Sequence, residues 1–92
     1  MKQFVFKIVP VLNPDGVARG YWRTDCNGTN LNRVYSNPDP LVYPTIYATR
    51  QVLLRENART RLFAYVDLHG HATKRGCFVF GNSIPDKLQH IE

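Results

Sequence analysis

The chain is poor in cysteine and in long apolar runs, and each shortage excludes a class of protein. Its 92 residues contain two cysteines, Cys26 and Cys77, which form neither a disulfide framework nor a zinc-type pair at short spacing. Free thiols are typical of a reducing compartment, so we expect a cytoplasmic protein. No apolar run approaches the roughly 20 residues that a membrane helix requires, so we expect no membrane partner.

The positive charge of the chain suggests an acidic partner. The formal net charge is +5 at pH 7, which favours binding to negatively charged molecules. Nucleic acid is the general expectation for such a charge, but no basic run is interleaved with aromatic residues as in modules that read RNA or DNA. We therefore expect an acidic partner other than nucleic acid.

Hydrophobic patterning predicts three strands and one helix. The segments that resemble buried strands are residues 4–12, 62–68 and 77–81. Residues Asn13 to Gly16 (NPDG) form a strong turn signal after the first of them. Apolar residues from Tyr43 to Leu54 recur at helical spacing, and Pro44 suits a first helical turn. Strands flanking a helix predict an α/β fold with a largely parallel sheet and helical cover.

A long loop without periodicity, from Val17 to about Asp39, separates the turn from the predicted helix. Loops of this length are usually functional. Its four candidate binding residues are Arg19, Arg23, Asn32 and Arg33. An arginine grips a carboxylate through a planar fork, an adjacent asparagine can fix the orientation, and an arginine near a metal can stabilise an oxyanion. The alternative is that these arginines are solvated or paired with the aspartates of the region, Asp15, Asp25 and Asp39.

Two histidines, His69 and His71, follow the apolar segment 62–68 directly. A histidine at the carboxyl end of a strand is a frequent position for a metal ligand or a catalytic base in α/β proteins. One histidine alone does not bind a metal, so the rest of such a site must come from other residues.

The segments NPDGVARGYWRTDCNGTNLNR and DLHGHATKRGCFVFGN resemble the core of the zinc carboxypeptidases, specifically their cytosolic branch. Enzymes of that branch remove glutamates from tubulin tails and other acidic termini. Five motifs, NPDG, RTD, NLNR, DLHGH and KRGC, occur in the order typical of the type-five subgroup. The resemblance implies that residues 1–92 are the central part of a catalytic domain, incomplete at both ends. Its fold would be a mixed, mostly parallel sheet flanked by helices.

The resemblance implies a role for each matching position. His69 matches the third zinc ligand, and Arg23 matches the arginine that polarises the scissile carbonyl and stabilises the oxyanion. Asn32 and Arg33 match the pair that binds the terminal carboxylate of the substrate. Arg19 matches less closely, as a subsite contact. The implied cofactor is Zn²⁺, and the implied partners are acidic C-terminal tails such as those of tubulin, in the cytoplasm, at microtubules or at cilia.

The sequence also departs from the family pattern. Asn30 stands where digestive relatives carry a zinc-supporting aspartate. The family's His-x-x-Glu motif, which supplies two zinc ligands, does not occur in these 92 residues. The general-base glutamate lies far downstream in the family, and neither Glu56 nor Glu92 has its sequence context. We therefore expect this segment alone to be inactive.

Two alternatives remain at this stage. Zinc acylases of the aspartoacylase type also carry an LNR segment and a DLH strand end, although NPDG and GHATKRGC favour the carboxypeptidase. A non-catalytic module could instead grip acidic termini through Arg23, Asn32 and Arg33. Lys74 and Arg75 could add positive potential for a glutamate side chain, or they could simply be solvated surface charges.

Overall fold

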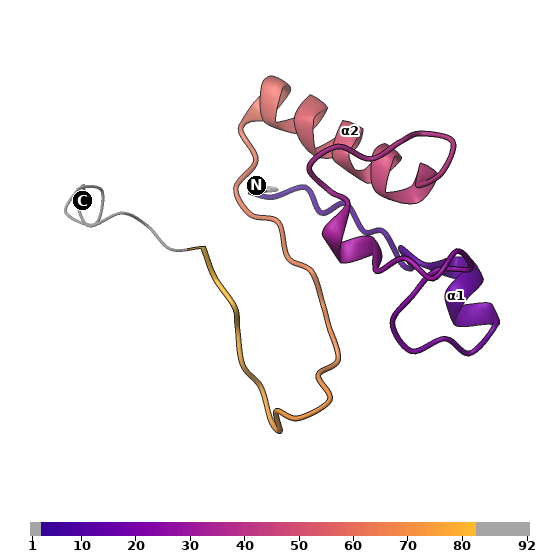
Figure 1. Ribbon diagram of the computed structural model, residues 1–92. Helices are drawn as coiled ribbons and strands as arrows, with labels where there is room; N and C mark the ends of the chain where they lie inside the picture. Colours follow the sequence, from indigo (N-terminus) through magenta and orange to yellow (C-terminus); the bar gives the residue numbers. More distant parts are fainter. Residues whose placement is uncertain (1–2, 83–92) are drawn as a thin grey trace.

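The computed structural model describes residues 3–82, in which helices and extended segments surround a very small core. The helices are α1 (Pro14–Ala18), the 3-10 helix η1 (Leu31–Arg33) and α2 (Pro44–Thr60) (Figure 1). Ile46 of α2, at 1% exposure, is the largest fully buried side chain in this part of the chain. No helix within residues 3–82 has the length and apolar character needed to cross a bilayer.

The helix predicted after the long loop is confirmed as α2. Pro44 occupies its first turn, where the missing N–H has no intrahelical partner in any case. Before it, the carboxylate Oδ1 of Asp39 accepts hydrogen bonds from the backbone N–H groups of Leu41, at 2.8 Å, and Val42, at 3.2 Å. This Asx turn directs the chain into the helix, which continues beyond the predicted span to Thr60.

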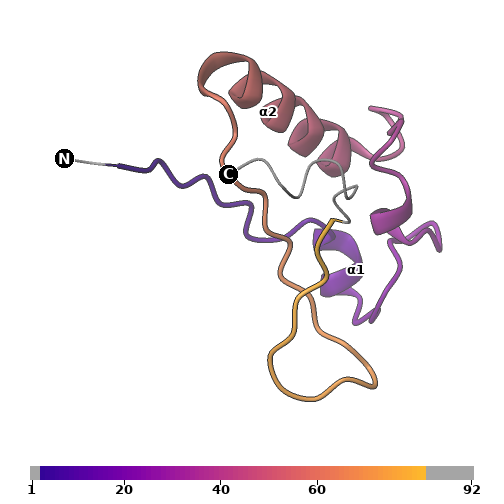
Figure 2. The same cartoon turned by 90° about the vertical axis from the view of Figure 1, so that its left-hand side faces the viewer.

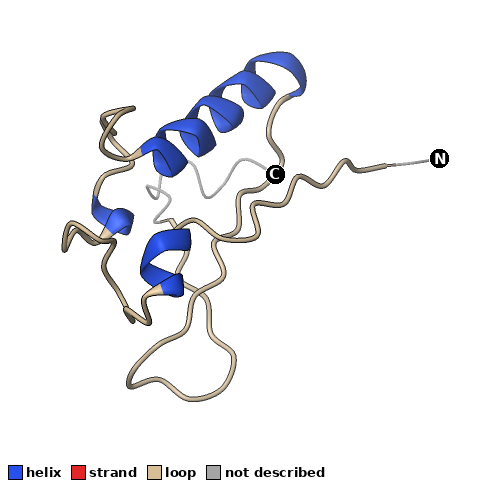
Figure 3. Cartoon of the chain, turned by 90° about the vertical axis from the view of Figure 1, so that its right-hand side faces the viewer, coloured by secondary structure: helices blue, strands red, loops and turns tan. Residues whose placement is uncertain are grey.

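The segments expected as strands are extended, and none is assigned as a strand within residues 3–82 (Figure 3). Residues 62–68 and 77–81 run in opposite directions, and the loop that joins them projects away from the helices (Figures 1 and 2). Phe6, Phe63 and Leu68 are 84%, 85% and 91% exposed. A strand is stable only when neighbouring strands complete its hydrogen bonds and cover its side chains. The mostly parallel sheet therefore stays a prediction.

Two contacts tie the first extended segment to α2. Lys7 Nζ lies 2.6 Å from the Glu56 carboxylate, and the Thr45 hydroxyl donates to the Leu12 carbonyl at 2.8 Å. The hydrogen bond from Lys7, reinforced by its charge and by the nearby Arg59 and Arg55, lowers the pKa of Glu56. These contacts place the segment before the NPDG motif along the helix that follows the loop.

Candidate active site

The NPDG motif forms the start of α1 and clamps the loop beside Arg23. The side-chain Oδ1 of Asn13 accepts from the Gly16 N–H at 3.1 Å, and its Nδ2 donates to the Thr24 carbonyl at 2.9 Å. A Cβ at Gly16 would lie 2.5 Å from the same carbonyl oxygen, so only glycine allows this close approach. The predicted turn is therefore a short capped helix that holds the residue next to Arg23.

A tight turn around Asp25 follows directly. Its carboxylate Oδ1 accepts from the backbone N–H of Asn27 at 2.9 Å and of Thr29 at 2.7 Å. The Asp25 N–H in turn donates to the Thr29 carbonyl at 2.9 Å. Gly28 adopts φ +77° within this turn, a conformation that favours glycine. The turn fixes the spacing between Arg23 and the NLNR segment.

Replacing Asp25 by alanine is expected to destabilise the full-length protein by about 1–3 kcal/mol, because the backbone donors of the turn lose their acceptor. Asp25 is only 8% exposed, so water cannot replace the carboxylate fully. Asp25→Asn keeps an acceptor oxygen and should lose less than half as much. Urea unfolding of the three proteins measures the difference, and equal stability of Asp25→Ala and wild type would contradict this role.

Asn30 caps the helix that carries the predicted carboxylate-binding pair. Its Oδ1 accepts from the Asn32 N–H at 3.1 Å, and its carbonyl accepts from the Arg33 N–H at 3.0 Å. Both Asn32 and Arg33 are exposed. The Arg33 guanidinium donates to the Asn32 carbonyl at 3.4 Å, so the two side chains emerge from one short turn. Asn30 thus holds the backbone of the NLNR segment in the conformation of a short turn.

The loop arginines are exposed and available to a ligand. Within residues 3–82, none of Arg19, Arg23 and Arg33 lies within 4.0 Å of a carboxylate. The Arg23 guanidinium instead lies 4.8 Å from the Trp22 ring centroid, in a cation–π contact. Asp25 and Asp39 accept backbone N–H groups instead, so the part of the alternative that holds within residues 3–82 is the one with solvated arginines.

His69 and His71 differ in their surroundings. His69, whose side chain is 56% exposed, has its Nδ1 3.1 Å from Asp67 Oδ1. The Nδ1 of His71 accepts from the backbone N–H groups of Thr73 at 3.2 Å and Lys74 at 3.1 Å. His71 thereby closes its own loop.

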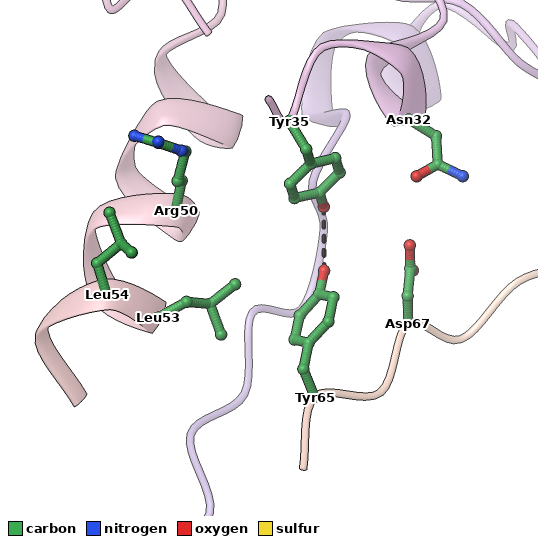
Figure 4. A pocket seen from close by; sticks show the side chains of 7 residues that line it. All are labelled: Asn32, Tyr35, Arg50, Leu53, Leu54, Tyr65 and Asp67. Atoms are coloured by element: carbon green, nitrogen blue, oxygen red, sulfur yellow. Dashed lines mark hydrogen bonds between the residues drawn. The ribbon is translucent and has the colours of Figure 1, made fainter. Parts of the chain in front are cut away.

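An open hollow of about 480 Å³ lies between α2, the residues around η1 and the segment that leads to His69 (Figure 4). Its lining residues are Asn32, Tyr35, Arg50, Leu53, Leu54, Tyr65 and Asp67. The side chains of Asn32 and Asp67 point toward one another across it. Asn32 of the predicted carboxylate-binding pair therefore shares a hollow with the aspartate that contacts His69.

Two tyrosines meet in the same hollow. The hydroxyl oxygens of Tyr35 and Tyr65 are 3.1 Å apart (Figure 4). Burial raises the pKa of Tyr35 well above its usual value of 10, and the hydrogen bond with Tyr65 and the charge of Asp67 add to the shift. Tyr35 therefore stays a neutral hydroxyl at any physiological pH.

Other predicted residues are not brought together. Arg19, Arg23, Arg33 and His69 do not line this hollow. No group of three His, Cys, Asp or Glu residues that could hold a metal ion occurs in the described part of the chain. Both cysteines are free thiols, as expected. Residues 3–82 thus offer one candidate imidazole ligand and, apart from it, a turn that carries the predicted carboxylate-binding pair.

The chain has relatives among known proteins, although no family model matches it. Cytosolic carboxypeptidase 1 of Gallus gallus is 42% identical over 90 residues, which cover 97% of this chain and 7% of the relative. Cytosolic carboxypeptidase-like protein 5 of Mus musculus and of Homo sapiens is 29% identical over 174 residues, covering 97% of this chain and 20% of each relative.

The chain is similar to the cytosolic carboxypeptidases over nearly its whole length. It spans only 7% to 20% of the length of these curated relatives. Since the 174 aligned positions are nearly twice the 92 residues of this chain, the match to the type-5 relatives includes a long stretch without a counterpart here. The resemblance to cytosolic carboxypeptidases is confirmed, and both type 1 and type 5 are among the relatives.

Sequence reasoning missed three residues of this carboxypeptidase segment that line the hollow, namely Tyr35, Arg50 and Tyr65. For Tyr65 a signal was present, because it alternates with Asp67 and His69 and so shares one face of an extended chain. For Arg50 a signal was also present, because it lies four residues after Ile46 and three before Leu53, on the face of α2 that the apolar spacing marks.

Proposed function

We propose that the full-length protein is a zinc-dependent carboxypeptidase that removes C-terminal or branched glutamates from acidic protein tails. Tubulin tails are the candidate substrate, and the cytoplasm, at microtubules or cilia, is the candidate location. The observation that carries the proposal is the capped turn with exposed Asn32 and Arg33, which shares its hollow with Asp67, the neighbour of His69. Such a turn suits a substrate that ends in a free carboxylate.

Each residue would contribute a distinct interaction. Arg33 would hold the terminal carboxylate in a bidentate pair, and Asn32 would orient it with one further hydrogen bond. Arg23 would donate to the carbonyl oxygen as negative charge develops there. Arg19, exposed at the end of α1, would contact a residue further along the peptide.

His69 would hold zinc together with ligands from outside this segment, since residues 3–82 contain no complete set. Its exposed imidazole, on an extended segment and next to a carboxylate, fits a ligand that an acidic neighbour orients. A bound zinc supplies Lewis-acid activation of water and of the peptide carbonyl. Relatives named carboxypeptidases favour this chemistry over that of a zinc acylase.

Preference for glutamate has its best support in the loop after His69. Lys74 Nζ lies 5.0 Å from the Phe78 ring centroid and 4.3 Å from that of Phe80. These cation–π contacts hold Lys74 against the loop itself. Arg75 is exposed and makes no ion pair with any residue between 3 and 82. Arg75 is therefore the better candidate for the side-chain carboxylate.

The test is a comparison of peptides with the full-length protein. A peptide ending in glutamates should release glutamate, whereas its C-terminal amide and a glutamine-ended peptide should be poor substrates. Arg33→Ala should lower kcat/KM for the glutamate peptide by about 10- to 150-fold, because a charge-assisted pair is lost. Arg59→Ala, an exposed arginine in the last turn of α2, is the matched control and should match wild type.

Two results would contradict the proposal. The zinc-loaded protein could release no glutamate from any acidic peptide, or it could cleave the amide as fast as the free acid. Binding of acidic peptides without cleavage, dependent on Arg33, would instead identify a non-catalytic module that recognises acidic termini.

A further inference from the structure

Two tyrosines connect elements of the site that lie far apart in the sequence. Tyr35 lies two residues after Arg33, and Tyr65 lies on the extended segment that leads to His69. Their hydroxyl contact of 3.1 Å joins positions 30 residues apart. In the described part of the chain, it is the one hydrogen bond between the loop 17–39 and residues 62–82. This contact therefore links the two regions directly.

Each tyrosine is closely connected to a different part of the site. Tyr35 follows the turn in which the Asn30 side chain fixes the backbone of Asn32. Tyr65, Asp67 and His69 occupy alternate positions of an extended chain and so share a face. A displacement of Tyr65 would therefore shift His69, and a displacement of Tyr35 would shift the carboxylate-binding turn.

We propose that the Tyr35–Tyr65 hydrogen bond is a positioning contact that sets the separation between the carboxylate-binding turn and the segment carrying His69. The inference rests on the proposed function. An exopeptidase must hold the terminal carboxylate and the scissile carbonyl at a fixed spacing, and a small misplacement lowers the rate even when the substrate still binds. The two tyrosines act through Asn32, Arg33 and His69, so they are positioning residues.

A purely structural role is the alternative that the experiment must separate. Tyr35 is half-buried in the open hollow and its hydroxyl meets that of Tyr65, so the hydrogen bond would by itself add to the stability of the fold. Loss of a structural contact would lower the stability of the protein or its zinc content. Loss of a positioning contact would lower kcat while substrate affinity and zinc content stay constant.

The experiment measures kcat, KM and zinc content of the full-length enzyme with a glutamate-ended peptide. The variants are Tyr35→Phe, Tyr65→Phe and the double variant, which keep the rings and remove only the hydroxyl groups. Tyr47→Phe is the matched control, because Tyr47 of α2 is 36% exposed and its hydroxyl makes no hydrogen bond within residues 3–82. Each single variant should lower kcat roughly fivefold, the effect of one uncharged hydrogen bond.

The double variant should be no slower than either single variant, because all three lack the same contact. KM should change less than about twofold in each of them, since the binding groups themselves remain. An active wild type with both single variants equal to Tyr47→Phe would overturn the inference alone. Additive losses, a raised KM at constant kcat, or loss of zinc would also overturn it. A wild type that releases no glutamate would remove the proposed function, and the inference with it.

Discussion

Replacing His69 by alanine is expected to abolish both zinc binding and glutamate release in the full-length enzyme. His69 is the residue of this segment that matches a zinc ligand, and its ring is exposed beside Asp67. A catalytic zinc has three protein ligands. Changing the hydrogen-bond partner of one ligand lowers zinc affinity roughly 10- to 100-fold, so removing a ligand itself should lower zinc affinity further. Elemental analysis and glutamate release from an acidic peptide measure the two effects.

His71→Asn is the matched control for this prediction. The His71 Nδ1 accepts two backbone N–H groups of its loop, and an asparagine side chain can accept hydrogen bonds from the same backbone positions. The variant should therefore keep stoichiometric zinc and most of the activity. Full zinc content in His69→Ala, or equal zinc loss in the two variants, would show that His69 is not the ligand.

Replacing Arg23 by glutamine should lower kcat by about 10²- to 10³-fold, the cost of removing one donor to a developing oxyanion. The Asn13 side chain donates to the Thr24 carbonyl at 2.9 Å and so fixes the backbone next to Arg23. The Arg23 guanidinium also rests on the Trp22 ring, which limits its motion. Because substrate binding depends on other residues, KM should change little.

Arg59→Gln gives the comparison for the loss of one positive charge. Arg59 is exposed in the last turn of α2, far in sequence from the loop. If both variants reduced the rate equally, the effect of Arg23 would reflect general electrostatic attraction of the acidic substrate. An increase in KM at constant kcat would place Arg23 with the substrate-binding residues instead.

The sequence predicted the longest helix correctly because its signals are local. Pro44 and the Asp39 turn mark the start of α2, and apolar spacing marks its buried side at Ile46. The NPDG segment was also located correctly, although it begins a short helix. That difference arose because the Asn13 side chain caps the next turn and reaches Thr24, a contact between residues 11 positions apart.

The candidate site was predictable from the sequence only where family motifs cover it. Family motifs indicated Arg23, Asn32, Arg33 and His69 as candidates by position alone, without any knowledge of their neighbours, and their roles stay predictions. They did not identify the tyrosine pair, since Tyr35 and Tyr65 lie in separate segments and meet only in the folded chain. The alternation of Tyr65 with Asp67 and His69 indicated a shared face but not what that face contacts.

By itself the sequence predicted the resemblance to the cytosolic carboxypeptidases and the long helix, and it indicated candidate carboxylate-binding residues, because motifs and helical spacing depend on neighbouring residues. The contacts of Asp25 and Asp39 are also local, because the backbone N–H groups that they accept lie two to four residues along the chain. Only the tertiary structure decided that Asn32 shares a hollow with Asp67 and that Tyr35 meets Tyr65. Such pairings depend on which distant segments approach each other, and many arrangements of one local pattern satisfy the same sequence signals.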